Sequence, residues 1–296
     1  MNYNNIRLTI QNGGSLSKLI SLNVLIFVVV NIFLILLRLF NFDGSVILSY
    51  LAVPADLSQL LQRIWTPVTY MFLHENLFHV LFNMLALYWF GKLFLMFYSQ
   101  KQLVGIYVVG GLFGAFIYIV SYQLFPFYSR VIQNSILLGA SGSIMAIIVA
   151  SAVRSPNIEM QLMFVGAVKL KYIAIVSVLI SLFGITSSNG GGELAHLGGA
   201  LAGYLFVVSL QKGVDITGLI TKIFDVANGL FRPRKLKVKK SRYKTKPMSD
   251  AEFNIQKAKK MAEIDRILDK IKSSGYSSLT PDEKKQLFEQ GNRGNI

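Results

Sequence analysis

The chain of 296 residues contains no cysteine, only three histidines and few charged residues in its first two thirds. Without cysteine it can form neither disulfide bonds nor thiolate metal sites. Three histidines leave few side chains that could act as a general base near neutral pH. Residues 1–211 carry only 10 of the 30 Lys and Arg and 5 of the 15 Asp and Glu. That is too little charge to cover a soluble globule of this size.

The hydropathy of the chain instead predicts a protein that crosses a membrane several times. Hydrophobic residues make up 53% of the sequence, and the mean hydropathy is +0.49. Most of the net charge of +15 lies in residues 212–296, which could indicate a tail that binds nucleic acid. We favour another explanation of this charge: basic residues gather on the cytosolic side of membrane proteins, where they are attracted to anionic lipid headgroups. We therefore expect no nucleic-acid partner.

Six apolar segments are expected to be membrane-spanning helices. Basic residues precede the first segment, follow the second, fourth and sixth, and are sparse in the other connections, so both termini are expected in the cytosol. The stretch Ile158–Val168 is apolar but too short to span, and we interpret it as a cytosolic interfacial segment. The six segments cover about residues 19–40, 75–98, 103–124, 136–153, 172–186 and 194–210.

A serine among glycines opens the fourth segment, in the order Gly139-Ala140-Ser141-Gly142. Glycine permits a tight turn and a close backbone approach, and the unpaired N–H groups at a helix N-terminus favour negative charge. These properties suit a serine nucleophile. The alternative is close helix packing by small residues, which is the commoner reason for such a motif in membranes.

His196 lies inside the sixth segment, and Gly199 and Gly203 share its helical face. A stripe of small residues lets two helices touch backbone to backbone. If the neighbouring helix is the one that begins at Ser141, the imidazole can reach that hydroxyl and take its proton. The alternative is a histidine that only hydrogen-bonds at a helix contact, but the coincidence of serine, histidine and glycine stripe favours a catalytic pair.

The second segment supplies two further polar side chains. His79 and Asn83 are four residues apart and share a face, and both can donate hydrogen bonds. With the Ser141 backbone N–H they could form an oxyanion hole, although an interhelical hydrogen bond is the alternative for Asn83. His74 lies about 140° away from His79 around the helix, so we expect a structural hydrogen bond from it to the first loop.

Other catalytic classes fit the sequence less well. His-Glu-x-x-x-His has one residue more than the zinc-protease motif, which turns the second histidine off the first one's face, so we expect no metal. Aspartyl proteolysis would need two aspartates within spans. An inverted repeat with polar residues along several spans, typical of transporters, is not found. The acids before the tail, Glu193 among them, lie near segment ends or in loops. We therefore expect a Ser-His dyad without a carboxylate, its ring held by backbone and aromatic contacts.

The combination resembles the rhomboid intramembrane serine proteases over about residues 19–212. The three motifs occur in order on the second, fourth and sixth segments: His74-x4-His79-x3-Asn83, Gly139-Ala140-Ser141-Gly142 and Ala195-His196-x2-Gly199-x3-Gly203. In place of the family's Trp-Arg pair in the first loop the chain has Trp65-Thr66. The structuring role of that arginine is therefore missing or taken by Arg63, which concerns the stability of the loop rather than catalysis.

This resemblance implies an all-α membrane protein with a six-helix bundle and a Ser141–His196 dyad in a water-filled cavity open to the extracytoplasmic side. It implies oxyanion stabilisation by His79, Asn83 and the Ser141 amide, and no cofactor. The implied substrates are single-span or other transmembrane proteins, and the implied location is a bacterial plasma membrane. Inactive rhomboid relatives bind membrane clients without cutting them, which is the alternative function.

The expected domain organisation has four parts: a cytosolic N-terminal segment (1–18), the six-span domain (19–212), a basic juxtamembrane linker (213–248) and a C-terminal appendage (249–296). The run from Arg232 to Lys246 holds nine Lys and Arg, and we expect it to bind anionic lipid headgroups.

The appendage is predicted to be a small helical hairpin. Ser249 and Glu252 have capping-box spacing, Gly275 offers a stop, and Thr280-Pro281 starts a second helix. The first of these helices should carry an apolar stripe at Met261, Ile264, Leu268 and Ile271.

Overall fold

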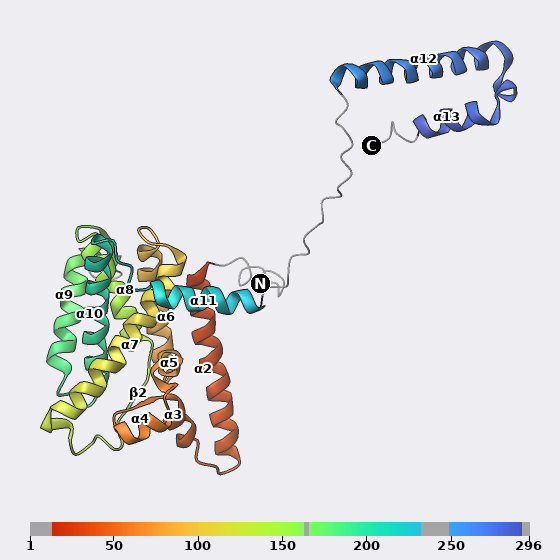
Figure 1. The fold of residues 1–296 in the computed structure, drawn as a ribbon. Helices are drawn as coiled ribbons and strands as arrows, with labels where there is room; N and C mark the ends of the chain where they lie inside the picture. Colours follow the sequence, from red (N-terminus) through yellow and green to blue (C-terminus); the bar gives the residue numbers. More distant parts are fainter. Residues whose placement is uncertain (1–13, 163–165, 232–248, 292–296) are drawn as a thin grey trace. The chain divides into compact units, whose positions relative to one another are not determined.

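The computed structural model describes residues 14–162, 166–231 and 249–291 of the chain. The predicted N-terminal segment (in large part) and the whole basic run Arg232–Lys246 lie outside these residues. The chain divides into two units, Met1–Arg232 and Pro233–Ile296, and each is described by itself (Figure 1).

The first unit is mostly helical. Two short antiparallel strand pairs accompany its helices: β1 (Val53–Pro54) with β2 (Ile136–Leu137), and β3 (Glu159–Leu162) with β4 (Gly166–Lys169). The helices are α2 (Ser15–Leu39), α3 (Ser45–Leu51), α4 (Leu57–Gln62), α5 (Thr66–Thr69), η1 (Tyr70–Phe72), α6 (Leu77–Phe94), α7 (Gln100–Leu124), η2 (Pro126–Tyr128), α8 (Ser141–Arg154), α9 (Leu170–Gly184), α10 (Gly190–Gln211) and α11 (Gly218–Phe231).

Each of the six apolar segments overlaps one helix, in order α2, α6, α7, α8, α9 and α10. Within the described part of the chain, α2, α6, α7 and α10 are long and apolar enough to cross a membrane, whereas α8 and α9 are shorter. The 14 residues of α8 extend about 21 Å, less than the roughly 30 Å of bilayer hydrocarbon. At least one end of α8 therefore lies within the thickness that its longer neighbours can span.

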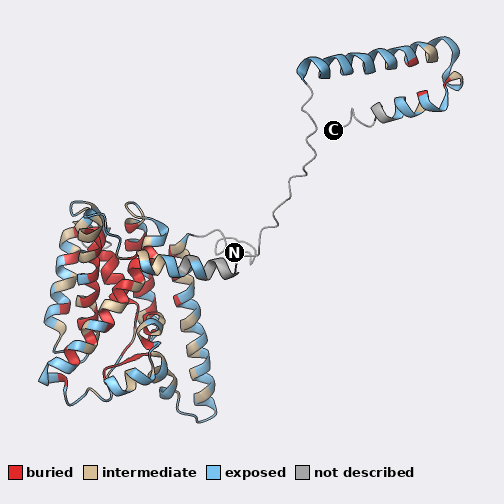
Figure 2. Ribbon diagram, viewed as in Figure 1, coloured by how far each residue is buried: buried red, intermediate tan, exposed pale blue. Residues whose placement is uncertain are grey.

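The core of this unit is built around α8, against which α7 and α10 pack. Every residue from Gly142 to Ala152 is buried, and Figure 2 shows buried residues concentrated in these three helices. A Cβ added at Gly199 on α10 would overlap the Gly142 carbonyl oxygen, and one at Gly203 would overlap that of Ala146. The predicted glycine stripe is thus confirmed as the surface where α10 meets α8 backbone to backbone.

The connection between α2 and α6 is a folded loop held by polar contacts. Arg63 donates from Nη1 to the Ser49 carbonyl oxygen at 2.7 Å, and its guanidinium lies 4.3 Å from the centre of the Tyr50 ring. Trp65 Nε1 donates to the Tyr50 carbonyl oxygen at 2.8 Å, and the Thr66 hydroxyl donates to the Arg63 carbonyl oxygen at 2.8 Å. Arg63 therefore fills a structuring role in this loop, and Thr66 supports the same turn.

The same loop is tied to the bundle and to the turn before α8. The buried Tyr70 hydroxyl donates to the Gly111 carbonyl oxygen at 2.6 Å, and the Tyr107 hydroxyl donates to that of Met71 at 2.8 Å. The backbone N–H of Gly139 donates to the Tyr70 carbonyl oxygen at 3.0 Å. The β1–β2 pair joins the same two regions, with Val53 opposite Leu137.

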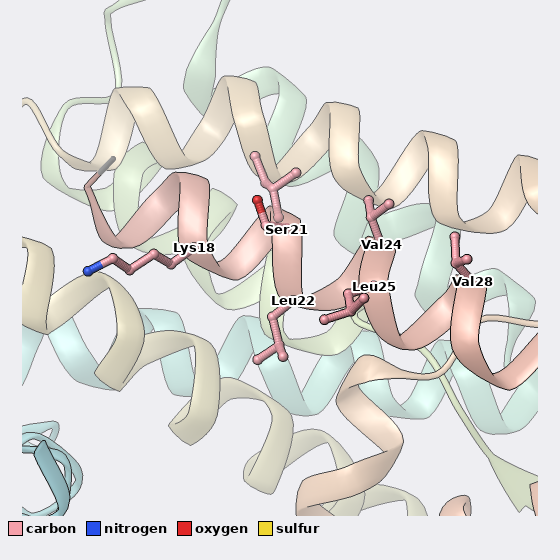
Figure 3. Close-up of a pocket in the computed structure, with 7 residues that line it drawn as sticks. Lys18, Ser21, Leu22, Val24, Leu25 and Val28 are labelled. Carbon is pink, nitrogen blue, oxygen red and sulfur yellow. The ribbon is translucent and has the colours of Figure 1, made fainter. Parts of the chain in front are cut away.

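Most of α2 faces away from the rest of the unit, and its buried residues are Leu16, Leu19 and Asn23. An open apolar groove of about 620 Å³ runs along its outer face, where Figure 3 shows Leu22, Leu25 and other apolar side chains with Lys18 toward one end. An apolar helix face that ends in a lysine is typical of a helix that faces lipid, with its ammonium group at headgroup level.

Two stretches take a form that the sequence did not suggest. The stretch interpreted as interfacial contains β3 and most of β4, which pair antiparallel with Glu159 opposite Lys169. The stretch expected to be linker includes helix α11, which packs against α7.

The second unit contains α12 (Asp250–Ser274), η3 (Tyr276–Ser278) and α13 (Pro281–Gly291). The predicted capping box of Ser249 and Glu252 is formed, and α12 ends at Gly275, whose φ is 78°. Of the predicted apolar stripe, Ile264 and Ile271 are half-buried and Met261 and Leu268 are exposed, whereas Ile267 beside the stripe is fully buried. The helical character of the tail is therefore confirmed, while its covered face overlaps the predicted stripe only in part.

The carboxylate of Glu283 joins the two helices of this unit. It accepts hydrogen bonds from Lys270 Nζ at 2.9 Å and from the Thr280 backbone N–H at 2.8 Å. The backbone hydrogen bond from Thr280 and the hydrogen bond from Lys270 hold the pKa of Glu283 well below its ordinary value, at about 2.

Candidate active site

Ser141 is the first residue of α8 and follows a turn that requires glycine. Gly139 has a φ of 128°, in the region that only glycine adopts readily. A Cβ added there would lie 3.1 Å from His79 Nε2 and 3.6 Å from Ser141 Oγ. The missing side chain therefore leaves room for these two polar groups to approach each other. At this position the serine amide belongs to the first turn of α8, whose N–H groups have no partner within the helix.

His196 lies on α10 in the part of the helix that packs against the start of α8. The backbone approach at Gly199 fixes α10 against Gly142, the residue that follows Ser141. A Cβ added at Gly142 would itself lie 3.1 Å from the Ala195 carbonyl oxygen. Two chain segments 55 positions apart (196 minus 141) are thus brought together by small residues on both helices.

The four residues predicted to carry catalysis line one cavity. Its volume is about 350 Å³, and its lining includes His79, Asn83, Ser141, His196, Asn189 and Gly192. Asn83 is buried, whereas Ser141, His196 and His79 are partly exposed. No hydrogen bond joins the Ser141 hydroxyl to the His196 ring among the described residues. Catalytic hydrogen bonds in free enzymes often tighten only when substrate binds.

The imidazole of His196 has a carboxylate partner, which corrects the expectation of a ring held by backbone and aromatic contacts alone. Glu193 Oε2 lies 3.1 Å from His196 Nδ1, and Ser181 Oγ on α9 lies 3.1 Å from the same nitrogen. Glu193 belongs to the first turn of α10 and not to a loop, because the helix begins at Gly190. The spacing of three residues between Glu193 and His196 was the signal in the sequence that could have revealed this pair.

His79 is oriented by the start of α6. The Asn76 side chain accepts a hydrogen bond from the His79 backbone N–H at 2.9 Å, and the Glu75 backbone N–H donates to His79 Nδ1 at 3.4 Å. When Nδ1 accepts a hydrogen bond, the proton of the neutral ring is on Nε2. The nitrogen that faces Gly139 and the serine turn is therefore a donor.

His74 does not make the hydrogen bond to the first loop that we expected. The residue is only 5% exposed, and neither ring nitrogen has a hydrogen-bond partner among the described residues. Its ring instead makes T-shaped contacts with the rings of His79 and Phe27. The centre of the His74 ring lies 5.2 Å from that of His79 and 6.5 Å from that of Phe27. Burial, and to a lesser extent the neighbouring His79, lowers the pKa of His74 to about 4, so it packs as a neutral ring.

The described residues hold no group of three His, Asp or Glu side chains arranged to bind a metal ion. The side chains in and beside the cavity supply a hydroxyl at a helix start, an imidazole with a carboxylate beside it, and hydrogen-bond donors from α6.

Comparison with known proteins places this site within a described domain. The model of the Rhomboid domain family matches residues 61–212, just over half of the chain, and a family of unknown function, DUF6576, matches residues 249–292. RHOMBOID-like protein 12, mitochondrial, of Arabidopsis thaliana is 27% identical over 160 residues, which cover 51% of this chain and 48% of that protein. The match thus spans about half the length of this relative. With its long apolar helices, the chain is a multi-pass membrane protein.

Proposed function

Because the chain belongs to the rhomboid family, which includes intramembrane serine proteases, we propose that it is an intramembrane serine endopeptidase. Its substrates are single-span or other transmembrane proteins, cut near the extracytoplasmic face of the membrane. The observation that carries this proposal is the common cavity: Ser141 from α8, His196 from α10, and His79 and Asn83 from α6 all line it.

In the proposed reaction His196 removes the proton of Ser141 as the hydroxyl oxygen attacks the scissile carbonyl carbon. The tetrahedral intermediate collapses to an acyl-enzyme when the amine leaves with the proton from His196. A water molecule, deprotonated by the same ring, then hydrolyses the ester and restores the serine. The position of Ser141 at the start of α8 supports this role, because the helix dipole stabilises negative charge there.

The oxyanion is assigned to the Ser141 backbone N–H, His79 Nε2–H and the Asn83 amide. The Nε2–H tautomer of His79 supports this assignment, as does the short distance from that nitrogen to the turn at Gly139. A donor aimed at a developing oxyanion contributes about 10²–10³-fold to the rate of acyl transfer.

The proposed topology has six spans with both termini in the cytosol of a bacterium, in its plasma membrane. Basic residues beside the connections after α6 and α8 support this orientation, and the basic linker would bind anionic headgroups on the same side. A substrate helix that contains small or helix-breaking residues would unwind most easily into the cavity, because its backbone must leave the helix to be cut.

The test uses the purified full chain in detergent, a fluorophosphonate probe that labels reactive serines, and a model single-span substrate. Ser141→Ala and His196→Ala should reduce both labelling and cleavage to background. Ser143→Ala is the matched control, because Ser143 is buried two residues further along α8 and its hydroxyl has no hydrogen-bond partner within the described part of the chain. It should keep wild-type activity.

Labelling or cleavage that survives in Ser141→Ala would refute the assignment of the nucleophile. A folded wild-type protein that is neither labelled nor active, yet retains transmembrane clients, would support the client-binding alternative instead.

A further inference from the structure

We propose that Glu193 is a positioning residue that fixes the tautomer and orientation of His196, so that the site works as a Ser141–His196–Glu193 triad and not as a simple dyad. This inference rests on the proposed protease function. Its central observation is the 3.1 Å distance between Glu193 Oε2 and His196 Nδ1.

The chemistry of the two groups sets the direction of this hydrogen bond. An ionised carboxylate can only accept, so Nδ1 must carry the hydrogen when the two atoms are bonded. In the neutral ring Nε2 then holds the lone pair, which is the form a general base requires. The opposite tautomer would place the Nδ1 lone pair against the carboxylate and leave no basic nitrogen for Ser141.

The carboxylate is itself held in place by the contact between α10 and α9. A Cβ added at Gly184, the last residue of α9, would lie 2.8 Å from Glu193 Cγ and 3.1 Å from its Cδ, so the glycine makes room for this side chain. The side chains of Glu193 and His196 are only 16% and 20% exposed. Partial burial strengthens the attraction between the carboxylate and the ring, compared with the same pair of groups in water, when the ring becomes protonated.

Ser181 connects α9 to the same nitrogen. Its hydroxyl is buried, and Oγ lies 3.1 Å from His196 Nδ1, where it can share the ring hydrogen with the carboxylate. The ring is thus supported from its own helix by Glu193 and from α9 by Ser181. We assign Ser181 the smaller part, because a neutral hydroxyl binds a developing imidazolium less strongly than a carboxylate does.

The polar groups around His196 come from four helices. Glu193 lies on α10 and Ser181 on α9, while Ser141 on α8 and His79 on α6 share the cavity. Glu193 is the carboxylate bonded to the ring, and His79 is the other ionisable group of the cavity. Neutralising Glu193 therefore removes the negative charge that stabilises the protonated ring.

The test measures the rate of fluorophosphonate labelling of the purified full chain as a function of pH, with kcat and KM for a model transmembrane substrate. Glu193→Gln keeps the shape of the side chain but removes its charge. We expect the labelling rate and kcat to fall about 100-fold with little change in KM, and the acidic limb of the pH profile to move to lower pH. Glu159→Gln, which neutralises an exposed glutamate on β3, is the matched control and should behave as the wild type.

Glu193→Asp keeps the charge and shortens the side chain by one methylene. It should lower kcat while its acidic limb stays closer to that of the wild type, and it serves as the test if Glu193→Gln does not fold. A wild-type rate and pH profile in Glu193→Gln, or in Glu193→Asp where that variant stands in, would overturn the positioning role. Because that result requires a wild-type protein that is labelled at Ser141, it is distinct from failure of the proposed function, in which the wild type itself is not labelled.

Discussion

Replacing Gly199 with alanine is the most direct test of the packing that assembles the site. The added methyl group would overlap the carbonyl oxygen of Gly142, an atom of the α8 backbone that cannot rotate away. The two helices must therefore separate or tilt, and the displaced residues would be Ser141 on one side of the contact and His196 on the other.

Two opposing effects decide the size of the change. Alanine is a better helix former than glycine by about 1 kcal/mol, which favours the variant. Overpacking of a closely fitted contact costs about 1–3 kcal/mol, and here the neighbour is backbone, so we expect the higher part of that range. The net loss should be about 1–2 kcal/mol, or a fall in Tm of several degrees at roughly 2–4 °C per kcal/mol. Activity should fall further, since a displacement of about 1 Å in an active site can cost 10²-fold.

The measurements are thermal unfolding of the purified protein in detergent and its rate of fluorophosphonate labelling. Gly218→Ala is the matched control, because Gly218 begins α11 and a Cβ there would have no neighbour within 4 Å. That variant should be neutral or slightly stabilised. Wild-type Tm and labelling in Gly199→Ala would refute the argument that direct backbone contact between α8 and α10 positions the site.

Two further predictions concern regions outside the cavity. Arg63→Ala removes the hydrogen bond to the Ser49 carbonyl oxygen in α3 and the contact with the Tyr50 ring. Amide exchange in α3 should therefore rise about 10-fold, for a local loss of about 1.4 kcal/mol. Unchanged exchange would count against the structuring role of Arg63. Glu283 has a pKa lowered from 4.5 to about 2, so its contribution to tail stability should be complete above pH 4.5 and lost as the pH falls toward 2. Amide protection of α12, corrected for intrinsic exchange, should show this loss in the wild type and not in Glu283→Gln.

Hydrophobic pattern and glycine spacing were sufficient to predict the six apolar helices of the first unit and the surface that assembles the site. The segment that contains His196, Gly199 and Gly203 is one helix, and its glycines contact the start of the serine helix as expected. These predictions succeeded because helical periodicity determines which residues share a face, and because only small residues permit direct backbone contact.

The features that the sequence analysis missed depend on where helices begin and on which of their faces pack against other parts of the protein. Glu193 was placed near a segment end because apolar runs do not mark the first polar turn of a helix, which here starts at Gly190. His74 was expected to find a polar partner, yet tertiary packing surrounds it with rings. In the tail, Ile267 beside the predicted stripe is fully buried, since contact with η3 and α13 decides together with the pattern of α12 which face is covered.

The pairing of β1 with β2 has a consequence for the order of folding. It joins Val53 to Leu137, two positions far apart in the chain, and the turn with Gly139 follows it directly. Contacts of long sequence separation form late, because the intervening chain must first be ordered. The turn that carries the nucleophile therefore acquires its final geometry only after the first loop has docked.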